Sequence, residues 1–249
     1  MADFTARTQL FLGREALQKL ADARVALFGL GGVGGYALEA LVRSGVGHLL
    51  LVDNDRFSLS NLNRQLLATR DSLGRRKTET ARERALSINP DCEAEIRDCF
   101  FLPETKNEFD FSAFDYVIDA IDTVAGKLCL IGAAQEAGVP VISCMGTGNK
   151  TDPTQLRVAD IEKTSVDPLA RVMRREYKKR GLAPFPVVFS LEEPRSIRDE
   201  EREVIAEEVK RRKEQGIARK DIPGSMVFVP AAAGLLLARK VVEDLIRQS

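Results

Sequence analysis

Short apolar runs alternate with helix-forming segments along the first 150 residues. The apolar runs lie at 25–28, 49–52, 116–118 and 139–143. A run of this length is typical of a strand that is buried on both faces of a sheet. We expect helices at 14–22, 33–43, 77–87 and 125–137. Strands that alternate with helices predict an α/β fold, built on a Rossmann-like, doubly wound and mostly parallel sheet.

The pattern changes near Lys150. Residues 151–224 hold most of the charge runs and six of the ten prolines, and their apolar segments are short. We therefore interpret 1–150 as a Rossmann-like domain. Residues 151–249 are interpreted as a C-terminal elaboration that completes the same domain.

Two segments of this elaboration have a distinct composition. Residues 190–220 are highly charged, and we expect them to be partly mobile, with a glutamate- and arginine-rich helix at 199–215. The apolar stretch 226–238 contains Pro230 and Gly234 and is shorter than the ~20 residues that span a bilayer. We interpret it as a buried strand, a turn and the start of a C-terminal helix, and we expect no membrane insertion.

Composition narrows the classes of function. The 37 basic and 37 acidic side chains balance, which excludes a general attraction of the whole molecule to nucleic acid or membrane, so a polyanion site must be a local patch. The first residues show no secretory signal, and we expect the protein in the cytoplasm. The four cysteines form no C-x-x-C pair, so we expect no structural zinc site. They are Cys92, Cys99, Cys129 and Cys144.

A glycine loop joins the first expected strand to its helix. Residues 29–34 fit G-x-G-x-x-G, with Gly29 for the turn, Gly31 and Gly32 where the backbone approaches phosphate, and Gly34 where helix and strand pack closely. Asp53 ends the second strand, nineteen residues after Gly34. This context predicts a nucleotide whose ribose is held by the Asp53 carboxylate, whereas the loop alone is weak evidence for any ligand.

Four polar residues favour ATP over NAD as that nucleotide. Asn61 and Arg64 follow Asp53 closely enough to fold back over phosphates, and Lys77 opens a helix from which its charge can reach a triphosphate. Asp122, at the carboxyl edge of the sheet, suits a Mg²⁺ ion that bridges phosphates. Taken singly, Arg64 and Lys77 could be surface charges and Asp122 a helix cap.

These motifs, taken together, resemble the adenylation domain of the ubiquitin-activating-like superfamily. That superfamily includes the adenylyltransferases of molybdopterin and thiamine biosynthesis. The resemblance implies that Asp53 binds ribose, and that the phosphates are contacted by Asn61, Arg64 and Lys77. It makes Asp122 the magnesium ligand. It also implies a homodimer, because Arg7 is similar to an arginine that reaches into the partner's ATP site.

Further motifs resemble one branch of this superfamily, the tRNA threonylcarbamoyladenosine dehydratases. They lie at 145–154, 158–164, 167–175 and 223–230. The resemblance implies an ATP-dependent dehydration that closes a ring on the modified adenosine next to the tRNA anticodon. ATP would first adenylate the threonyl carboxylate. The resemblance does not indicate whether a sulfur-relay protein partner takes part.

The tRNA partner requires a basic surface. We expect it on a helix over 171–180, where six cations oppose only Glu176 and where Tyr177 could stack on a base. The alternative is a solvated helix face. The cations are Arg171, Arg174, Arg175, Lys178, Lys179 and Arg180.

Two other functions stay open from the sequence. The first is an adenylating activator of a sulfur-carrier or ubiquitin-like protein. The absence of any cysteine after Cys144 weakens this hypothesis. The second is an NAD-binding oxidoreductase or a nucleotide-bound scaffold. A dehydratase needs no thioester, because the attacking atom is tethered beside the activated carbonyl.

Overall fold

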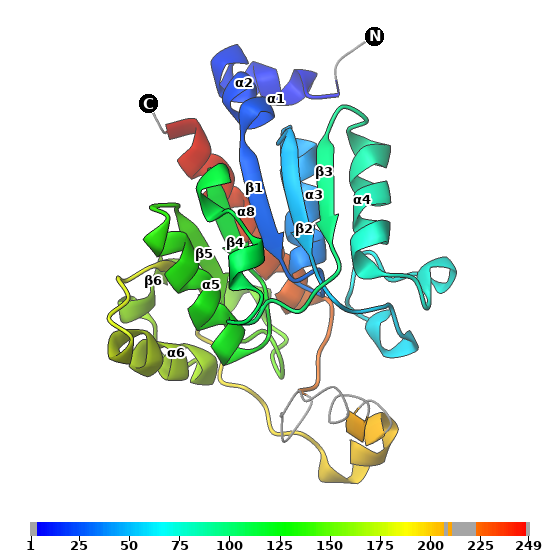
Figure 1. Ribbon diagram of the computed structural model, residues 1–249. Helices are drawn as coiled ribbons and strands as arrows, with labels where there is room; N and C mark the ends of the chain where they lie inside the picture. The colour runs from blue at the N-terminus through cyan, green and yellow to red at the C-terminus, as the bar shows by residue number, and fades with distance from the viewer. Residues whose placement is uncertain (1–3, 207–208, 211–222, 248–249) are drawn as a thin grey trace.

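The protein is built around one seven-stranded sheet with the strand order β3-β2-β1-β4-β5-β7-β6 (Figure 1). The computed structural model describes residues 4–206, 209–210 and 223–247. All neighbouring strands are parallel except β6, which pairs antiparallel with β7. The strands are β1 Arg24–Phe28, β2 His48–Val52, β3 Glu93–Arg97, β4 Tyr116–Asp119, β5 Val141–Cys144, β6 Leu156–Asp160 and β7 Pro186–Ser190.

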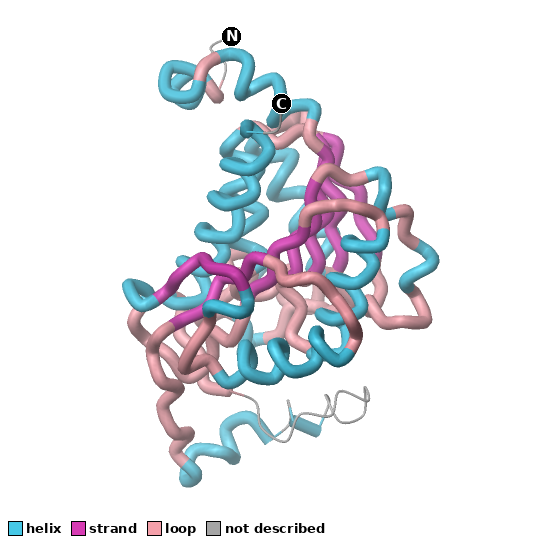
Figure 2. Tube along the Cα trace, turned by 90° about the vertical axis from the view of Figure 1, so that its left-hand side faces the viewer, coloured by secondary structure: helices cyan, strands magenta, loops and turns pink. Residues whose placement is uncertain are grey.

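Helices cover both faces of the sheet, as Figure 2 shows in a view turned by 90°. The α-helices are α1 Ala6–Leu12, α2 Arg14–Asp22, α3 Gly34–Ser44, α4 Lys77–Ile88, α5 Val124–Glu136, α6 Pro168–Lys179 and α8 Phe228–Arg247. The 3-10 helices are η1 Leu59–Asn61, η2 Arg70–Ser72, η3 Lys106–Glu108, η4 Phe111–Ala113, η5 Pro153–Gln155, η6 Ile161–Lys163 and η7 Asp199–Ile205. The expected α/β class and doubly wound, mostly parallel sheet are confirmed.

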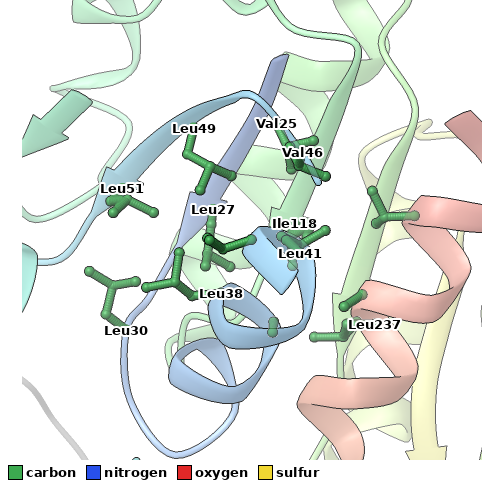
Figure 3. Packing of buried hydrophobic residues seen from close by; sticks show 14 of the residues in the cluster. Val25, Leu27, Leu30, Leu38, Leu41, Val46, Leu49, Leu51, Ile118 and Leu237 are labelled. Carbon is green, nitrogen blue, oxygen red and sulfur yellow. The ribbon is translucent and has the colours of Figure 1, made fainter. Parts of the chain in front are cut away.

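The buried strands send alternate side chains into two separate cores. Val25 and Leu27 of β1 pack with α3 and α8, as Figure 3 shows in close-up, whereas Ala26 and Phe28 pack with α5 and α6 on the other face. This alternation follows from the two-residue period of a strand. It explains why the strands appear in the sequence as continuous apolar runs.

The order of the strands determines where a ligand can bind. The chain moves outward from β1 to β2 and β3, and then returns to the other side of β1 with β4 and β5. Ligands of open α/β sheets bind outside the carboxyl ends of the strands at such a reversal. The loops after β1, β2, β4 and β5 therefore meet at the expected site.

The start of the C-terminal helix differs from expectation. No strand forms at 226–238: α8 begins at Phe228, and Met226 and Phe228 are about half exposed. Pro230 fits because the first turn of a helix needs no backbone N–H donors. The buried residues Val229 and Ala233 begin a series with a spacing of four, which continues along the helix through Leu237, Val241 and Leu245.

Two other segments also differ from the sequence interpretation. The strand expected at 139–143 begins only at Val141, although the carbonyl of Pro140 accepts a hydrogen bond from the Val117 N–H at 2.9 Å. The described start of the helix expected at 199–215 is the 3-10 helix η7, and most of its remainder lies outside the described residues. Within the described ranges, no helix has the length and hydropathy of a membrane span.

Candidate functional site

A cavity of about 460 Å³ lies at the carboxyl ends of the strands. Its wall is formed by the loops after β1 to β5, the start of α6, and Pro194, Pro223, Ser225 and Pro230. Most of the residues predicted to bind a nucleotide line this cavity. They are Gly29, Gly31, Gly32, Asp53, Arg64, Lys77 and Asp122.

Steric contacts explain two of the glycines. A Cβ atom on Gly29, whose φ is +92°, would lie 2.6 Å from the carbonyl oxygen of Ala120. A Cβ atom on Gly34 would lie 1.7 Å from the carbonyl oxygen of Gly29. Neither position accommodates a side chain without a backbone shift. The loop therefore brings the start of α3 against β1 and directs that helix N-terminus at the cavity, an arrangement that favours anions.

The Asp53 carboxylate holds the glycine loop. One oxygen accepts the backbone N–H of Leu30 at 2.7 Å, and the other accepts that of Asp55 at 2.8 Å. The side chain is 8% exposed. Asp53 thus links the loop after β1 to the loop after β2, at the place where the sequence predicts a ribose.

Lys77 lies in a cluster of charges at the start of α4. Its Nζ atom is 3.0 Å from Oδ2 of Asp55 and 3.7 Å from Oδ1 of Asp53, and the residue is 5% exposed. An ammonium group held between two carboxylates is fixed in position. Lys77 therefore presents an oriented cation at the wall of the cavity.

Arg64 and Asn61 have different roles. Arg64 lines the cavity and donates from Nη1 to the carbonyl oxygen of Ser60 at 2.7 Å. Asn61 is buried and does not line the cavity: its Oδ1 atom accepts the Ser58 N–H at 3.1 Å and caps the 3-10 helix η1. Asn61 thus supports the turn that carries Arg64. A contact between Asn61 and the phosphates stays a prediction.

Asp122 lies three residues beyond β4 and is exposed at the cavity wall. Among the residues that the structure describes, no group of three or more His, Cys, Asp or Glu side chains could hold a metal ion. Magnesium in nucleotide sites commonly uses one or two carboxylates together with phosphate oxygens and water. Asp122 fits such a site.

Arg7 lies on α1, far from the cavity of its own chain. Figure 1 shows α1 beyond the amino end of β1, whereas the cavity is at the carboxyl ends of the strands. Arg7 is exposed and does not line the cavity. A role for Arg7 in nucleotide chemistry therefore requires a second subunit.

Two buried lysine–aspartate pairs lie near the cavity and were missed by the sequence analysis. Lys127 of α5 is 3.1 Å from Asp119 of β4, and Lys150 is 2.5 Å from Asp167. All four side chains are at most 1% exposed. A lysine within the otherwise apolar stretch of α5 is a signal that could have indicated the first pair.

Gln65 was also missed. It lines the cavity, and its Oε1 atom is buried with no hydrogen-bond partner among the described residues. A buried acceptor without a partner is costly, so such an atom is typical of a site that receives a donor from a ligand or water.

The basic helix expected over 171–180 is α6, with one correction. Tyr177 is 2% exposed, stacks edge-on against Phe185 and donates to Glu162 at 2.7 Å, so it cannot stack on a base. Arg174 is half-buried and donates to the carbonyl oxygen of Thr164. The cations that remain exposed are Arg171, Arg175, Lys178, Lys179 and Arg180.

The cysteine thiols near the cavity are not activated. Burial raises the pKa of Cys144 to about 12, and it also raises the pKa of Cys99, which lines the cavity. The thiolate is the nucleophilic form of cysteine. Both groups are therefore protonated at neutral pH, which agrees with chemistry that uses no thioester.

Comparison with known proteins identifies relatives over nearly the whole chain. The model of the ThiF family matches residues 5–245. The tRNA threonylcarbamoyladenosine dehydratase of Bacillus subtilis is 43% identical over 243 residues, which cover 97% of this chain and 94% of that protein. An adenylyltransferase and sulfurtransferase of Saccharomyces cerevisiae is 33% identical over 144 residues, 57% of this chain and 32% of that protein.

Solved structures agree with the sequence relatives. The crystal structure of Escherichia coli tRNA N6-threonylcarbamoyladenosine dehydratase in complex with AMP superposes with a TM-score of 0.81 at 33% identity, covering 96% of this chain and 93% of that one. The complex of the same enzyme with ATP gives a TM-score of 0.82 at 32% identity, covering 96% and 92%. Escherichia coli MccB with ATP, at 20% identity and a TM-score of 0.64, covers 100% of this chain and 64% of that one and shares the fold.

Proposed function

This chain belongs to the ThiF family, and we propose that it is an ATP-dependent tRNA threonylcarbamoyladenosine dehydratase. One observation carries the proposal: the similarity to the Bacillus subtilis dehydratase extends over 97% of the chain. It therefore includes the segments after β5, whereas the similarity to the yeast adenylyltransferase and sulfurtransferase covers 57% of the chain. The cavity supports the proposal because its wall offers both a glycine loop and oriented cations.

The nucleotide would occupy the part of the cavity next to β1 and β2. The N-terminus of α3 and the backbone of Gly31 and Gly32 would face the phosphates, and Arg64 and Lys77 would balance their charge. The Asp53 carboxylate still has acceptor capacity for ribose hydroxyls, since each oxygen carries two lone pairs. Asn61 would support this arrangement from the turn that carries Arg64.

Asp122 would hold Mg²⁺, which neutralises negative charge on the phosphate oxygens when it is bound. The turn after β4 supports this role because it carries Asp122 to the cavity wall, and within it the Asp119 carboxylate accepts the Ile121 N–H at 3.1 Å. Lys127 fixes the same carboxylate from α5. These two buried residues act as positioning residues for Asp122.

The reaction would proceed in two transfers. A threonyl carboxylate oxygen attacks the α-phosphorus of ATP, so that pyrophosphate leaves and an acyl-adenylate forms. An atom of the same modification then attacks the activated carbonyl and closes a ring. Its proton passes to solvent, and AMP leaves with the oxygen atom of the lost water. Arg64 and Lys77 would stabilise the charge that develops on the phosphates.

The proposed reaction takes place in the cytoplasm and involves two partners, the substrate tRNA and a second subunit of the same protein. The helix α6 begins at the cavity wall with Pro168 and Leu169, and the exposed cations along it can contact the phosphates of an RNA. Arg7 would act in the partner's cavity within a homodimer, because α1 lies at the far end of its own sheet. A sulfur-relay partner is not required by the chemistry above.

Incubation with ATP, Mg²⁺ and modified tRNA tests the proposal. The modified nucleoside should lose the mass of one water, with one AMP and one pyrophosphate formed per turnover. Release of ADP and phosphate, or a nucleoside of unchanged mass, would refute it. Formation of an adenylate on the C-terminus of a ubiquitin-like protein instead would favour the activator function.

A further inference from the structure

The two buried lysine–aspartate pairs differ in their relation to the cavity. Lys127 and Asp119 lie beneath it and do not form part of its wall, whereas Lys150 and Asp167 both line it. The two pairs are equally buried. Burial of charge is costly even in a pair, so the pair at the cavity wall calls for a reason beyond stability.

Lys150 has one hydrogen-bond donor left for a ligand. Its Nζ atom donates to the carbonyl oxygen of Gly146 at 2.8 Å and to Oδ2 of Asp167 at 2.5 Å. An ammonium group carries three N–H donors. The described part of the chain provides no third acceptor for Lys150, so one N–H is left for a molecule in the cavity.

The residue directly before each member of the pair has a positive φ, and at Val166 this backbone conformation is strained. Asn149, directly before Lys150, has a φ of +59°, and Val166, directly before Asp167, has a φ of +61°. This region is unfavourable for a β-branched residue such as valine. The N–H of Asp167 donates to the carbonyl oxygen of Ser165 at 2.6 Å and closes a tight turn around Val166. Strain of this kind clusters at functional sites.

Asp167 is fixed from two directions. Its Oδ1 atom accepts the N–H of Ala170 at 2.9 Å and caps α6, while its Oδ2 atom accepts from Lys150. The Lys150 ammonium is thus anchored to the start of one helix and to the loop after β5. It has little freedom to move when a ligand enters.

Lys150 lies in the half of the cavity away from the nucleotide, where the acyl group of the substrate would bind. Among the described lining residues three are basic, and two of them, Arg64 and Lys77, lie on the nucleotide side. Lys150 follows β5, beyond Asp122 and β4 in the order of the sheet. A carboxylate that enters this half of the cavity loses water and needs a cationic partner. Lys150 is the cation that the described wall offers there.

We propose that Lys150 binds the substrate carboxylate that is to be adenylated, and that Asp167 is the positioning residue for Lys150. This inference rests on the proposed function and specifies its substrate as a carboxylate-bearing nucleoside side chain. A hydrogen bond between charged groups at this place would distinguish the acid from a neutral carbonyl of the same shape.

A matched pair of RNA ligands tests this inference. One is an anticodon stem–loop with threonylcarbamoyladenosine, and the other carries a primary carboxamide in place of the threonyl carboxylate. Kd is measured for both by fluorescence anisotropy, with α,β-methylene ATP present to prevent adenylation. We expect the wild-type protein to bind the acid about 10- to 100-fold more tightly than the amide.

The variants locate this preference. Lys150→Gln should abolish the preference by weakening the acid and not the amide, and Lys150→Arg should retain part of it. The double variant Lys150→Gln/Asp167→Asn removes both charges, so a fold that does not tolerate one unpaired buried charge can still be tested. The control is the double variant Lys106→Gln/Glu136→Gln, which removes an ion pair that does not line the cavity and should keep the preference.

The outcomes separate this inference from the proposed function. If Lys150→Gln and Lys150→Gln/Asp167→Asn both bind acid and amide in the wild-type ratio, or if the wild-type protein shows no preference, the inference is wrong. In either case, turnover of modified tRNA by the wild-type protein would leave the dehydratase function in place. A preference lost with Lys150 in a protein that dehydrates nothing would support the carboxylate site and refute the dehydration.

Discussion

Replacement of Lys127 by methionine should strongly destabilise the protein. Its ammonium donates to Asp119 at 3.1 Å and to the carbonyl oxygen of Cys144 at 2.7 Å, and Asp119 is fully buried. Removal of one partner from a buried ion pair typically costs about 3–5 kcal/mol, because the other charge is left uncompensated. That loss is a large fraction of the ~5–15 kcal/mol by which domains are stable.

Thermal and urea unfolding measure this effect. For a chain of 249 residues, the loss corresponds to a fall in Tm of roughly 6–20 °C, at about 2–4 °C per kcal/mol. The double variant Lys127→Met/Asp119→Asn should recover most of the stability, because the asparagine oxygen can still accept the Ile121 N–H and neither residue of the pair is then charged. A loss below about 1 kcal/mol in the single variant, or a double variant that is no more stable than the single one, would refute the reasoning.

Four further predictions concern the chemistry. Asp122→Asn should reduce turnover by at least about 100-fold in single-turnover assays while Tm is unchanged, because it removes charge from an exposed side chain; full activity would place the metal elsewhere. Arg7→Ala should be inactive alone yet regain partial activity when mixed with Asp122→Asn, because a mixed dimer contains one intact site; no recovery after proven subunit exchange would contradict action across subunits. Cys144→Ala should still dehydrate tRNA, because a thiol with a pKa raised to about 12 stays protonated at neutral pH; a folded variant that releases pyrophosphate without ring closure would require a thioester. Charge reversal of the exposed cations of α6 should weaken tRNA binding and flatten its salt dependence without affecting ATP binding, whereas unchanged tRNA affinity would leave α6 as a solvated face; the positions to reverse are Arg175, Lys178 and Lys179.

The parts of the fold that were predicted are those with a local signal. The central strands are apolar runs because they are buried on both faces, and the glycine loop has a spacing set by close contacts within a few residues. The start of α8 has a misleading signal: Met226 to Val229 is apolar in sequence, yet Met226 and Phe228 face solvent. Only the later spacing of four reveals a helix.

The unpredicted parts of the site depend on contacts between distant elements. Lys150 and Asp167 are 17 residues apart and meet only because the loop after β5 lies beside the start of α6. Tyr177 was expected to stack on a base because of its chemistry, but core packing and a hydrogen bond to Glu162 engage its side chain. Polar type alone does not distinguish a residue that binds a ligand from one that holds its neighbours.

The hydrogen bond from the Leu30 N–H to the Asp53 carboxylate has a consequence for the kinetics of nucleotide binding. Because protein donors already occupy part of the Asp53 carboxylate, the glycine loop has its binding shape before a nucleotide arrives. A preorganised loop loses little conformational entropy on binding, so association need not wait for a slow rearrangement. The Leu30 amide should therefore resist hydrogen exchange in the nucleotide-free protein. Any difference in affinity between ATP and AMP should come only from the contacts of the additional phosphates.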